Sequence, residues 1–232
     1  MTAPEMIAAI RDLMQNNRIQ GLMEAVYYAY GSAVRGDIVE FGTMTGDTAR
    51  AMGLSMLAVE GQYALPPKRI HLFDSFEGLP DPDRTPDLES PHVVLGHWSR
   101  GGCVGLTRSQ LELEMSLILP EDRYSLVEGW YSQTVPLIPL DQRFAMLHVD
   151  SDLYSSAIEA LMPLFERGQV SRGAVICFDD WMCNQADPAY GERKAFSEII
   201  EQFGVEFSPW GAYTWSGSRF IIHSYIGMSD DN

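Results

Sequence analysis

The chain has 232 residues, 46% of them hydrophobic, which is enough for one large domain with its own core. Its 32 acidic and 16 basic residues give a net charge of −16, so we expect no nucleic-acid partner and no anionic-membrane surface. No apolar run approaches the roughly 18 residues of a membrane helix, and the first residues lack the pattern of a signal peptide. Cys103, Cys177 and Cys183 are odd in number and lack metal-site spacing, which suits reduced thiols in a cytoplasmic protein.

The chain begins with a region of helical pattern. Apolar residues recur at helical spacing over 5–16 and again over 19–30, which predicts two helices, and Gly31 and Gly36 end the region. We treat residues 1–36 as a helical cap on a domain formed by residues 37–232. Because the apolar faces of these helices must be buried, we expect them to cover the functional site or to form an interface in a homo-oligomer.

Strand and helix patterns alternate through the rest of the chain. The predicted strands are 37–42, 69–74, 124–130, 144–150 and 174–179, with helices ending near residue 59 and over 107–119, 153–166 and 192–203. Two further strands near 205–210 and 213–223 are expected to form a hairpin, residues 81–105 a long lid-like loop, and residues 184–191 a flexible loop. This order predicts an α/β fold with a doubly wound, mostly parallel sheet, helices on both faces and an antiparallel strand at one edge.

Two of the predicted strands end in pairs of carboxylates. Asp150 and Asp152 follow the apolar run 144–149, and Asp179 and Asp180 follow the run 174–178. Parallel strands deliver such residues to the carboxyl edge of the sheet, where ligands bind in open α/β sheets. The four aspartates could bind a divalent cation, bind a cofactor or accept a proton from a substrate. Isolated acids would more simply cap a helix or face solvent, but two pairs at neighbouring strand ends favour a metal site.

A glycine-containing turn connects the first strand to its helix and carries Glu40, Gly42, Thr43 and Gly46. Such a turn lets the backbone approach a ligand and directs helix N–H groups toward it, although many such turns only close the connection. The spacing is not G-x-G-x-x-G, which disfavours a dinucleotide-dependent oxidoreductase. Glu40 could accept hydrogen bonds from a cationic amino group. Asp74, which ends the second strand and is followed by Ser75, could accept from ribose hydroxyls or cap a helix.

These features resemble the class I S-adenosylmethionine-dependent methyltransferases and, within that class, the macrocin O-methyltransferase family. The resemblance spans residues 37–205 and lies in five pieces: Asp37-Ile-Val-Glu-Phe-Gly42, Phe73-Asp-Ser-Phe-Glu-Gly-Leu-Pro80, Glu128-Gly-Trp-Tyr131, Val149-Asp-Ser-Asp-Leu-Tyr154 and Phe178-Asp-Asp-Trp181. Ser151 stands where that family commonly has glycine, and residues 84–105 do not match, so the identity of the acceptor stays open.

The resemblance implies a seven-stranded, Rossmann-like sheet and magnesium-dependent transfer of a methyl group from S-adenosylmethionine to a hydroxyl of a sugar or polyketide-type natural product. It implies Asp179 and Asp180 as Mg²⁺ ligands together with Asp150, or with Asp152 in its place. Asp150 and Asp152 are also the candidates for the base that takes the hydroxyl proton, and the sequence does not choose between them. The candidate donor-binding residues are Glu40, Gly42, Thr43, Gly46, Asp74, Ser75, Gly129, Trp130 and Asp150.

Other residues have competing interpretations. His148 could act as a base, but it lies inside a buried strand, so we expect a packed histidine, and His97 in the loop is a weaker alternative. Trp130 and Tyr131 could stack on adenine or pack in the core. Five further aromatic residues could form a wall around the acceptor or pack in the core: Trp181, Tyr190, Trp210, Tyr213 and Trp215. The alternative functions are a metal-independent methyltransferase on another small-molecule acceptor and a non-catalytic protein that retains the fold.

Overall fold

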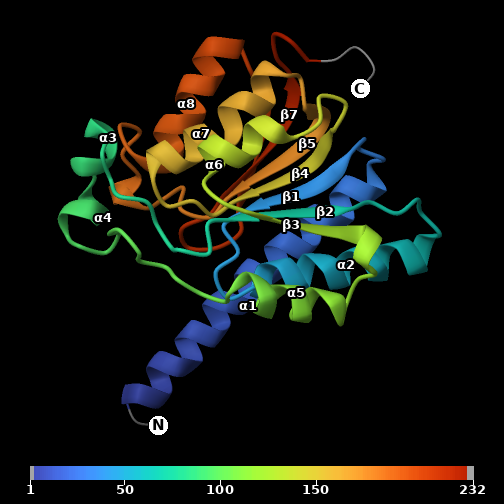
Figure 1. Cartoon of the computed structure of the whole chain (residues 1–232), viewed down its shortest axis with the longest axis horizontal. Helices are drawn as coiled ribbons and strands as arrows, with labels where there is room; N and C mark the ends of the chain where they lie inside the picture. The colour runs from blue at the N-terminus through green and yellow to red at the C-terminus, as the bar shows by residue number, and fades with distance from the viewer. Residues whose placement is uncertain (1–2, 229–232) are drawn as a thin grey trace.

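A seven-stranded sheet runs through the centre of the computed structural model, which describes residues 3–228 and the side chains from residue 16 onward (Figure 1). The strands are β1 Asp37–Phe41, β2 Ile70–Asp74, β3 Tyr124–Glu128, β4 Phe144–Val149, β5 Val170–Phe178, β6 Glu206–Ala212 and β7 Ser218–Ser224. Their order across the sheet is β3-β2-β1-β4-β5-β7-β6. The first five strands pair in parallel and β7 is antiparallel to both neighbours. The predicted doubly wound sheet is therefore confirmed, with one refinement: the antiparallel strand lies one position inside the edge, which β6 forms.

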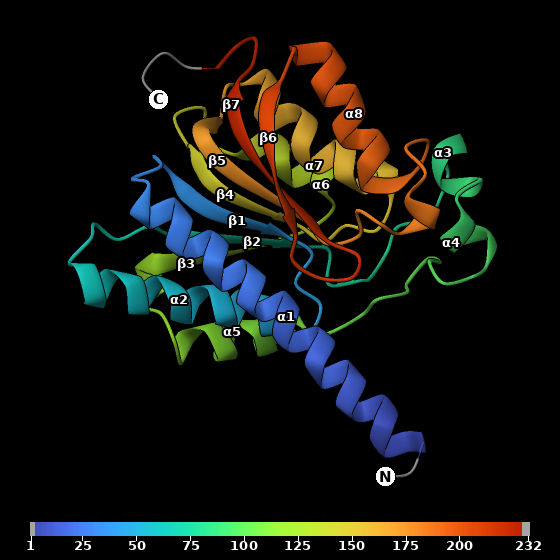
Figure 2. The same cartoon turned by 180° about the vertical axis from the view of Figure 1, so that it is seen from behind.

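Helices cover both faces of the sheet, as Figures 1 and 2 show. One face carries α1 Ala3–Gly31, α2 Asp47–Tyr63 and α5 Arg108–Ser116, and the other carries α6 Tyr131–Thr134, α7 Tyr154–Glu166 and α8 Gly191–Phe203. Short 3₁₀ turns lie at Glu121–Arg123, Val135–Leu137 and Asn184–Ala186. Because both faces are covered, the central strands are apolar throughout: every residue of β4 is buried.

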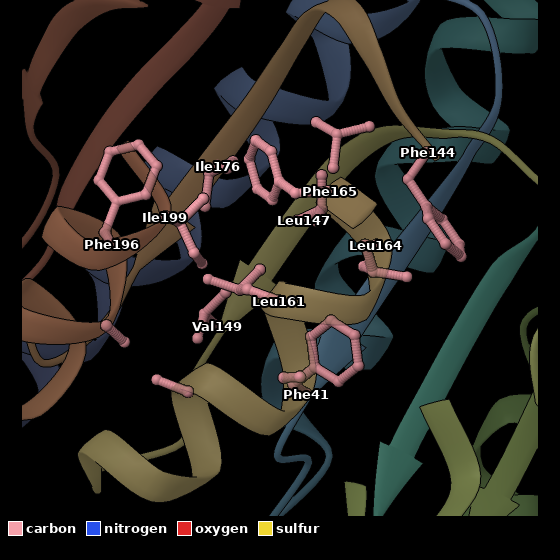
Figure 3. Close-up of a cluster of buried hydrophobic side chains, with 14 of the residues drawn as sticks. Phe41, Phe144, Leu147, Val149, Leu161, Leu164, Phe165, Ile176, Phe196 and Ile199 are labelled. Atoms are coloured by element: carbon pink, nitrogen blue, oxygen red, sulfur yellow. The ribbon is translucent and has the colours of Figure 1, made fainter. Parts of the chain in front are cut away.

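The core between the sheet and α7 and α8 is aromatic and aliphatic (Figure 3). Phe41, Leu147 and Ile176 of the strands meet Leu161 and Phe165 of α7. Each of these five side chains is fully buried. Removing one such side chain costs about 2–5 kcal/mol, so this layer fixes the positions of the strand ends that carry the site.

The N-terminal region is one continuous helix, α1, and the prediction of two helices over 5–16 and 19–30 is wrong. Asn16 and Asn17 are weak helix formers but do not break a helix, which proline would. Gly21 lies inside α1 for a packing reason: a Cβ there would meet the Cβ of Tyr213 at 2.4 Å. The helix from residue 21 onward packs on the sheet through Leu22 and Val26, while its first turns project away from the body (Figures 1 and 2). The division into a cap over 1–36 and a domain over 37–232 stays a prediction.

The segment 81–105 is not simply a loop, because it contains two short helices, α3 Thr85–Leu88 and α4 Pro91–Val94. A small apolar cluster of its own holds it down: Leu79 and Trp98 pack with Leu153 and Cys183. Its end is tied to the glycine turn, since the Leu106 amide donates to the Met44 carbonyl at 2.7 Å. The segment thus lies over the carboxyl edge of the sheet, and its action as a lid stays a prediction. None of the helices within residues 3–228 has the length and apolar character needed to span a bilayer.

Candidate active site

A cavity of about 670 Å³ opens at the carboxyl edge of the sheet. Nine of the predicted site residues line it: Gly42, Asp74, Ser75, Gly129, Trp130, Asp150, Asp152, Asp179 and Asp180. Glu40, Thr43 and Gly46 lie outside its lining. The wall is completed by residues of the segment 81–105, among them Asp83, Arg100 and Cys103. Residues far apart in the sequence therefore meet in one cavity, as the strand-end argument predicts.

The four aspartates after β4 and β5 meet at this edge, which defines the acid cluster of Asp150, Asp152, Asp179 and Asp180. The two strand ends are held side by side, because the Asp179 amide donates to the Val149 carbonyl at 2.9 Å. Burial, reinforced by the charges of the neighbouring aspartates, raises the pKa of Asp180 to about 7 and lifts the pKa of Asp152 well above its usual value. Burial likewise raises the pKa of Asp150 to about 6 even though Arg18 opposes it. The cluster carries more negative charge than its surroundings stabilise.

Arg18 of α1 enters the acid cluster, and no pattern in the sequence predicts this. Its Nη2 contacts Asp150 Oδ2 and its Nε donates to Asp179 Oδ1 at 2.9 Å. The side chain is 21% exposed and lines the cavity. Burial by itself lowers the pKa of Arg18, but Asp150 and Asp179 outweigh it and raise that pKa above its ordinary value, so the guanidinium stays charged. These contacts join residues 132 and 161 positions apart, which local sequence pattern cannot show.

Asp179 differs from the other members of the acid cluster. Its Oδ1 also accepts from the Tyr213 hydroxyl at 3.0 Å and lies 3.8 Å from His148 Nε2. Burial alone would raise the pKa of Asp179, but His148, Arg18 and the Tyr213 hydroxyl hold that pKa below its usual value. Asp179 is therefore the ionised anchor of the cluster.

His148 is completely buried, so the expectation of a packed histidine is confirmed. Its Nδ1 is 2.8 Å from Glu40 Oε1. Burial alone would lower the pKa of His148, but Asp179 and Glu40 on either side raise it to about 9. Glu40 is itself fully buried, and among the described residues its Oε2 has no hydrogen-bond partner. Glu40 thus lies behind the cavity wall with one oxygen still able to accept a hydrogen bond.

The glycine turn and Asp74 form the second half of the site. Asp74 Oδ2 accepts from the Thr43 amide at 2.7 Å and from the Thr43 hydroxyl at 2.8 Å. Its Oδ1 accepts from the Phe76 amide at 2.7 Å, and no helix begins there, so the alternative of a helix cap is wrong. Gly42 is required by backbone packing, because a Cβ at this position would lie 2.0 Å from the Asp150 carbonyl oxygen. Asp74 therefore organises the turn while also facing the cavity.

Glu192 of α8 is a second residue that the sequence analysis missed. Its Oε2 accepts from the Asp180 amide at 2.9 Å, and its Oε1 lies 3.4 Å from the Ser151 amide. The side chain is 1% exposed. Burial, with Asp180 next to it, raises the pKa of Glu192 well above its usual value. Its carboxyl group thereby joins the two loops that carry the acid cluster. The only indication of this role in the sequence is that Glu192 is an acidic residue in the first turn of a helix that follows a predicted loop.

The predicted aromatic residues divide between cavity and core. Trp130 and Tyr131 line the cavity, and Tyr131 also packs edge-on against Phe41 at 5.4 Å, so stacking on adenine stays a prediction. The cavity lining contains none of the five residues of the expected aromatic wall. Trp181 packs instead with Phe178 and Phe220, Trp210 with Tyr28, and Trp215 is exposed. His97 contacts the ring of His92 rather than the cavity.

Carboxylate oxygens are the donors that Mg²⁺ prefers, so the acid cluster suits this ion by its chemistry. Among the side chains of residues 16–228, however, no three His, Cys, Asp or Glu side chains are already arranged around one cation position. The guanidinium of Arg18 contacts two of the three predicted ligands, Asp150 and Asp179. The carboxylates of the predicted magnesium site are therefore present, and the guanidinium of Arg18 lies between two of them.

The sheet order, the glycine turn after β1 and the acids after β4 and β5 define a class I methyltransferase. The sequence pattern of the macrocin O-methyltransferase (TylF) family matches residues 7–205. The chain belongs to this family and is an S-adenosylmethionine-dependent O-methyltransferase. It is therefore an enzyme, which sets aside the alternative of a non-catalytic protein.

Known relatives agree with this assignment. A protein of Streptomyces olivaceus, the 8-demethyl-8-(2,3-dimethoxy-alpha-L-rhamnosyl)-tetracenomycin-C 4'-O-methyltransferase, is 28% identical over 188 residues, which cover 80% of this chain and 69% of that protein. The structure of the O-methyltransferase NovP matches with a TM-score of 0.72 at 22% identity, covering 90% of this chain and 80% of NovP. The calicheamicin methyltransferase CalS11 matches with a TM-score of 0.65 at 21% identity, covering 95% and 86%; it is also described as a TDP-rhamnose 3'-O-methyltransferase. At these identities the structural likeness establishes the fold.

Proposed function

We propose that this enzyme is magnesium-dependent and methylates a hydroxyl of a sugar on a natural product or on its nucleotide-linked precursor. The observation that carries the proposal is the acid cluster: four carboxylates at one edge of the cavity, three of them with a raised pKa caused by burial and by one another. Such a cluster is stabilised by a divalent cation and supplies the oxygen ligands that Mg²⁺ prefers.

The donor half of the site is the glycine turn with Glu40 and Asp74. Asp74 fixes Thr43 by two hydrogen bonds, and the buried Glu40 keeps one unpartnered oxygen that a cationic amino group could use. Gly129 and Trp130 line the cavity from the end of β3, and the Gly129 amide donates to the Asp74 carbonyl at 2.9 Å. These residues would bind S-adenosylmethionine and hold its methyl group toward the acids.

The acceptor half is the acid cluster. Asp150, Asp179 and Asp180 would hold Mg²⁺, which when bound lowers the pKa of a hydroxyl oxygen and orients it. Asp152 is our candidate for the base that takes the hydroxyl proton on its carboxylate. Its pKa is raised by burial and by Asp180, and Arg18 pairs with Asp150 rather than with it. A divalent cation in the cluster would offset the neighbouring negative charges that raise this pKa, and the Asp152 carboxylate would then be free to accept the proton.

The names of the relatives support a deoxysugar acceptor. One relative acts on a rhamnosyl group of a tetracenomycin and another is described for TDP-rhamnose. The cavity of about 670 Å³ is lined on its outer side by residues of the segment 81–105. We therefore expect a rhamnose-like ring near the acid cluster and its attached group under this segment.

Methyl transfer from isotopically labelled S-adenosylmethionine tests the proposal, with rhamnosylated tetracenomycins and TDP-rhamnose as acceptors. We expect chelation with EDTA to lower turnover at least about 100-fold, and added Mg²⁺ to restore it. Asp179→Ala is expected to lose turnover while still binding S-adenosylmethionine in calorimetry. Unchanged turnover after chelation would show that the metal role is wrong.

A metal-independent methyltransferase is the second candidate, and Arg18 is the observation that favours it. Its guanidinium already supplies a positive charge to Asp150 and Asp179. In that case turnover would survive chelation and fall in Arg18→Gln, and a wider panel of small-molecule acceptors would be needed.

A further inference from the structure

Arg18 connects the N-terminal helix to the acid cluster. We propose that Arg18 is an internal counter-cation that neutralises Asp150 and Asp179 before metal binding, and that a divalent cation entering the cluster displaces it. The proposal rests on the proposed magnesium site. In this proposal, α1 helps to set the affinity of that site for Mg²⁺.

Arg18 contacts the carboxylates in the way that a bound cation would. Two of its nitrogens contact two different aspartates, one after β4 and one after β5. Both of these aspartates belong to the predicted ligand set. Among the residues whose side chains are described, no other lysine or arginine forms a salt bridge with any member of the acid cluster. The neutralisation of the cluster therefore depends on this one guanidinium and on His148.

A second cation at these oxygens would compete with Arg18 for the same negative charge. Asp150 Oδ2 and Asp179 Oδ1 are already occupied by Arg18, and Asp179 Oδ1 also accepts from Tyr213. A divalent and a monovalent cation a few ångströms apart repel each other strongly in a partly buried site. Metal binding at these oxygens therefore opposes the guanidinium, and we expect the divalent cation to displace it.

The structure gives Arg18 room to leave without unfolding α1. The helix is anchored just beyond it, where Arg219 Nη1 donates to the Gly21 carbonyl and to Glu24 Oε2, each at 3.0 Å. The first turns of α1, which precede Arg18 along the helix, project away from the body (Figure 2). Arg18 thus lies at the boundary between the anchored and the projecting part, and it lines the open cavity. Rotation of its side chain, or bending of the projecting turns, would clear the carboxylates.

Isothermal titration with Mg²⁺, and with Mn²⁺ as a second probe, tests the proposal on the full chain. We expect Arg18→Gln to bind Mg²⁺ at least about tenfold more tightly than the unmodified enzyme, because a competing charge is removed. Arg18→Lys keeps the charge but loses the two-point contact, so its affinity should lie between the two. Arg172→Gln is the matched control: it removes an exposed arginine on β5 at the end away from Asp179, and its Mg²⁺ affinity should not change.

Hydrogen exchange provides a readout that does not depend on ion affinity. In the unmodified enzyme, Mg²⁺ should increase exchange of the α1 amides around residues 15–20, because their side-chain anchor is released. In Arg18→Gln these amides should exchange faster from the start and respond little to Mg²⁺. Thermal unfolding of each variant establishes that it is folded.

The outcomes separate this proposal from the proposed function. Equal or weaker Mg²⁺ binding by Arg18→Gln, with clear binding by the unmodified enzyme, would overturn the counter-cation role and leave the metal site standing. Absence of Mg²⁺ and Mn²⁺ binding in both proteins, together with turnover that survives chelation, would overturn the metal site and this proposal with it. Tighter binding by Arg18→Gln and the altered exchange of α1 would support both.

Discussion

Single buried side chains, rather than the aspartates alone, set the geometry of the acid cluster. Glu192 is the clearest case, because its two oxygens face the amides of Asp180 and Ser151 on separate loops. The backbone hydrogen bond from the Asp179 amide to the Val149 carbonyl joins the two strand ends, and Glu192 extends this connection into the loops, which contain no regular element at this point. Glu192 is therefore a positioning residue: it acts on the reaction through the loops that it holds.

Replacing Glu192 tests this role. Glu192→Ala leaves two buried amides without an acceptor, and we expect kcat to fall at least about tenfold while KM for S-adenosylmethionine stays nearly constant, since the donor half lies elsewhere. Glu192→Gln keeps one acceptor oxygen and should recover part of kcat. Glu201→Ala, an exposed change on the same helix, is the control. A parallel loss of kcat and donor affinity in Glu192→Ala would indicate a general structural defect instead.

At the scale of secondary-structure elements, a buried side chain also joins the segment 81–105 to helix α7. Asp87 in α3 is 1% exposed, and its carboxylate accepts from the Tyr154 and Ser155 amides at 2.7 and 3.0 Å. These amides begin α7, directly after the Asp150–Asp152 loop. The segment 81–105 therefore supplies the cap of the helix that follows the acids, and the cap comes from 67 residues away.

Removal of this cap should be measurable in stability. Asp87→Ala leaves the two N–H groups at the start of α7 without a hydrogen-bond acceptor. We therefore expect the free energy of unfolding, measured in urea, to fall by about 1–3 kcal/mol. Asp87→Asn retains one acceptor oxygen and should lose less. Glu89→Ala, an exposed substitution next to α3, should leave stability within about 0.5 kcal/mol. If Asp87→Ala were as stable as Glu89→Ala, the carboxylate would have no capping role.

The elements that sequence pattern predicted correctly are those defined by local periodicity. The apolar runs of β4 and β5 and the acids that end them required no knowledge of distant contacts. The contacts of Arg18, Glu192 and Asp87 depend instead on how helices dock, over separations of 12 to 161 residues. The prediction of two helices was wrong because Asn16 and Asn17, although weak helix formers, do not interrupt α1. The part of the site built from strand ends was thus predictable, and the part built from docked helices was not.

The whole molecule combines a charge of −16 with a helix whose first turns project from the body. The sequence of that projecting part has apolar residues at 6, 7, 10, 13 and 14. Apolar side chains at helical spacing are stabilised by burial against a partner, which keeps a homo-oligomer as our expectation. The cysteines are free, with Cys177 and Cys183 buried, and a cytoplasmic location also stays a prediction.

Light scattering with size-exclusion chromatography tests the expectation of an oligomer. We expect a mass that is a multiple of 26.0 kDa, and a shift toward 26.0 kDa when Ile7 and Ile10 are both changed to Asp. Two charges on one helix face oppose burial of that face. The exposed Leu137→Asp serves as the control, because it adds a charge elsewhere on the surface. A mass of 26.0 kDa for the unmodified protein would contradict the expectation.

The donor half and the acceptor half of the site both depend on the absence of a side chain at Gly42. The Asp150 carbonyl occupies the space that a side chain at position 42 would need. A residue larger than glycine there would push the end of β1 from the end of β4, and the donor turn would move relative to the acids. The two binding halves therefore cannot be redesigned independently: any change of acceptor pocket that shifts Asp150 also shifts the seat of the methyl donor. Engineering of acceptor specificity in this enzyme should begin at cavity-lining positions such as Asp83 and Arg100, which are neither the Asp87 cap of α7 nor part of the hydrogen bond between Leu106 and Met44.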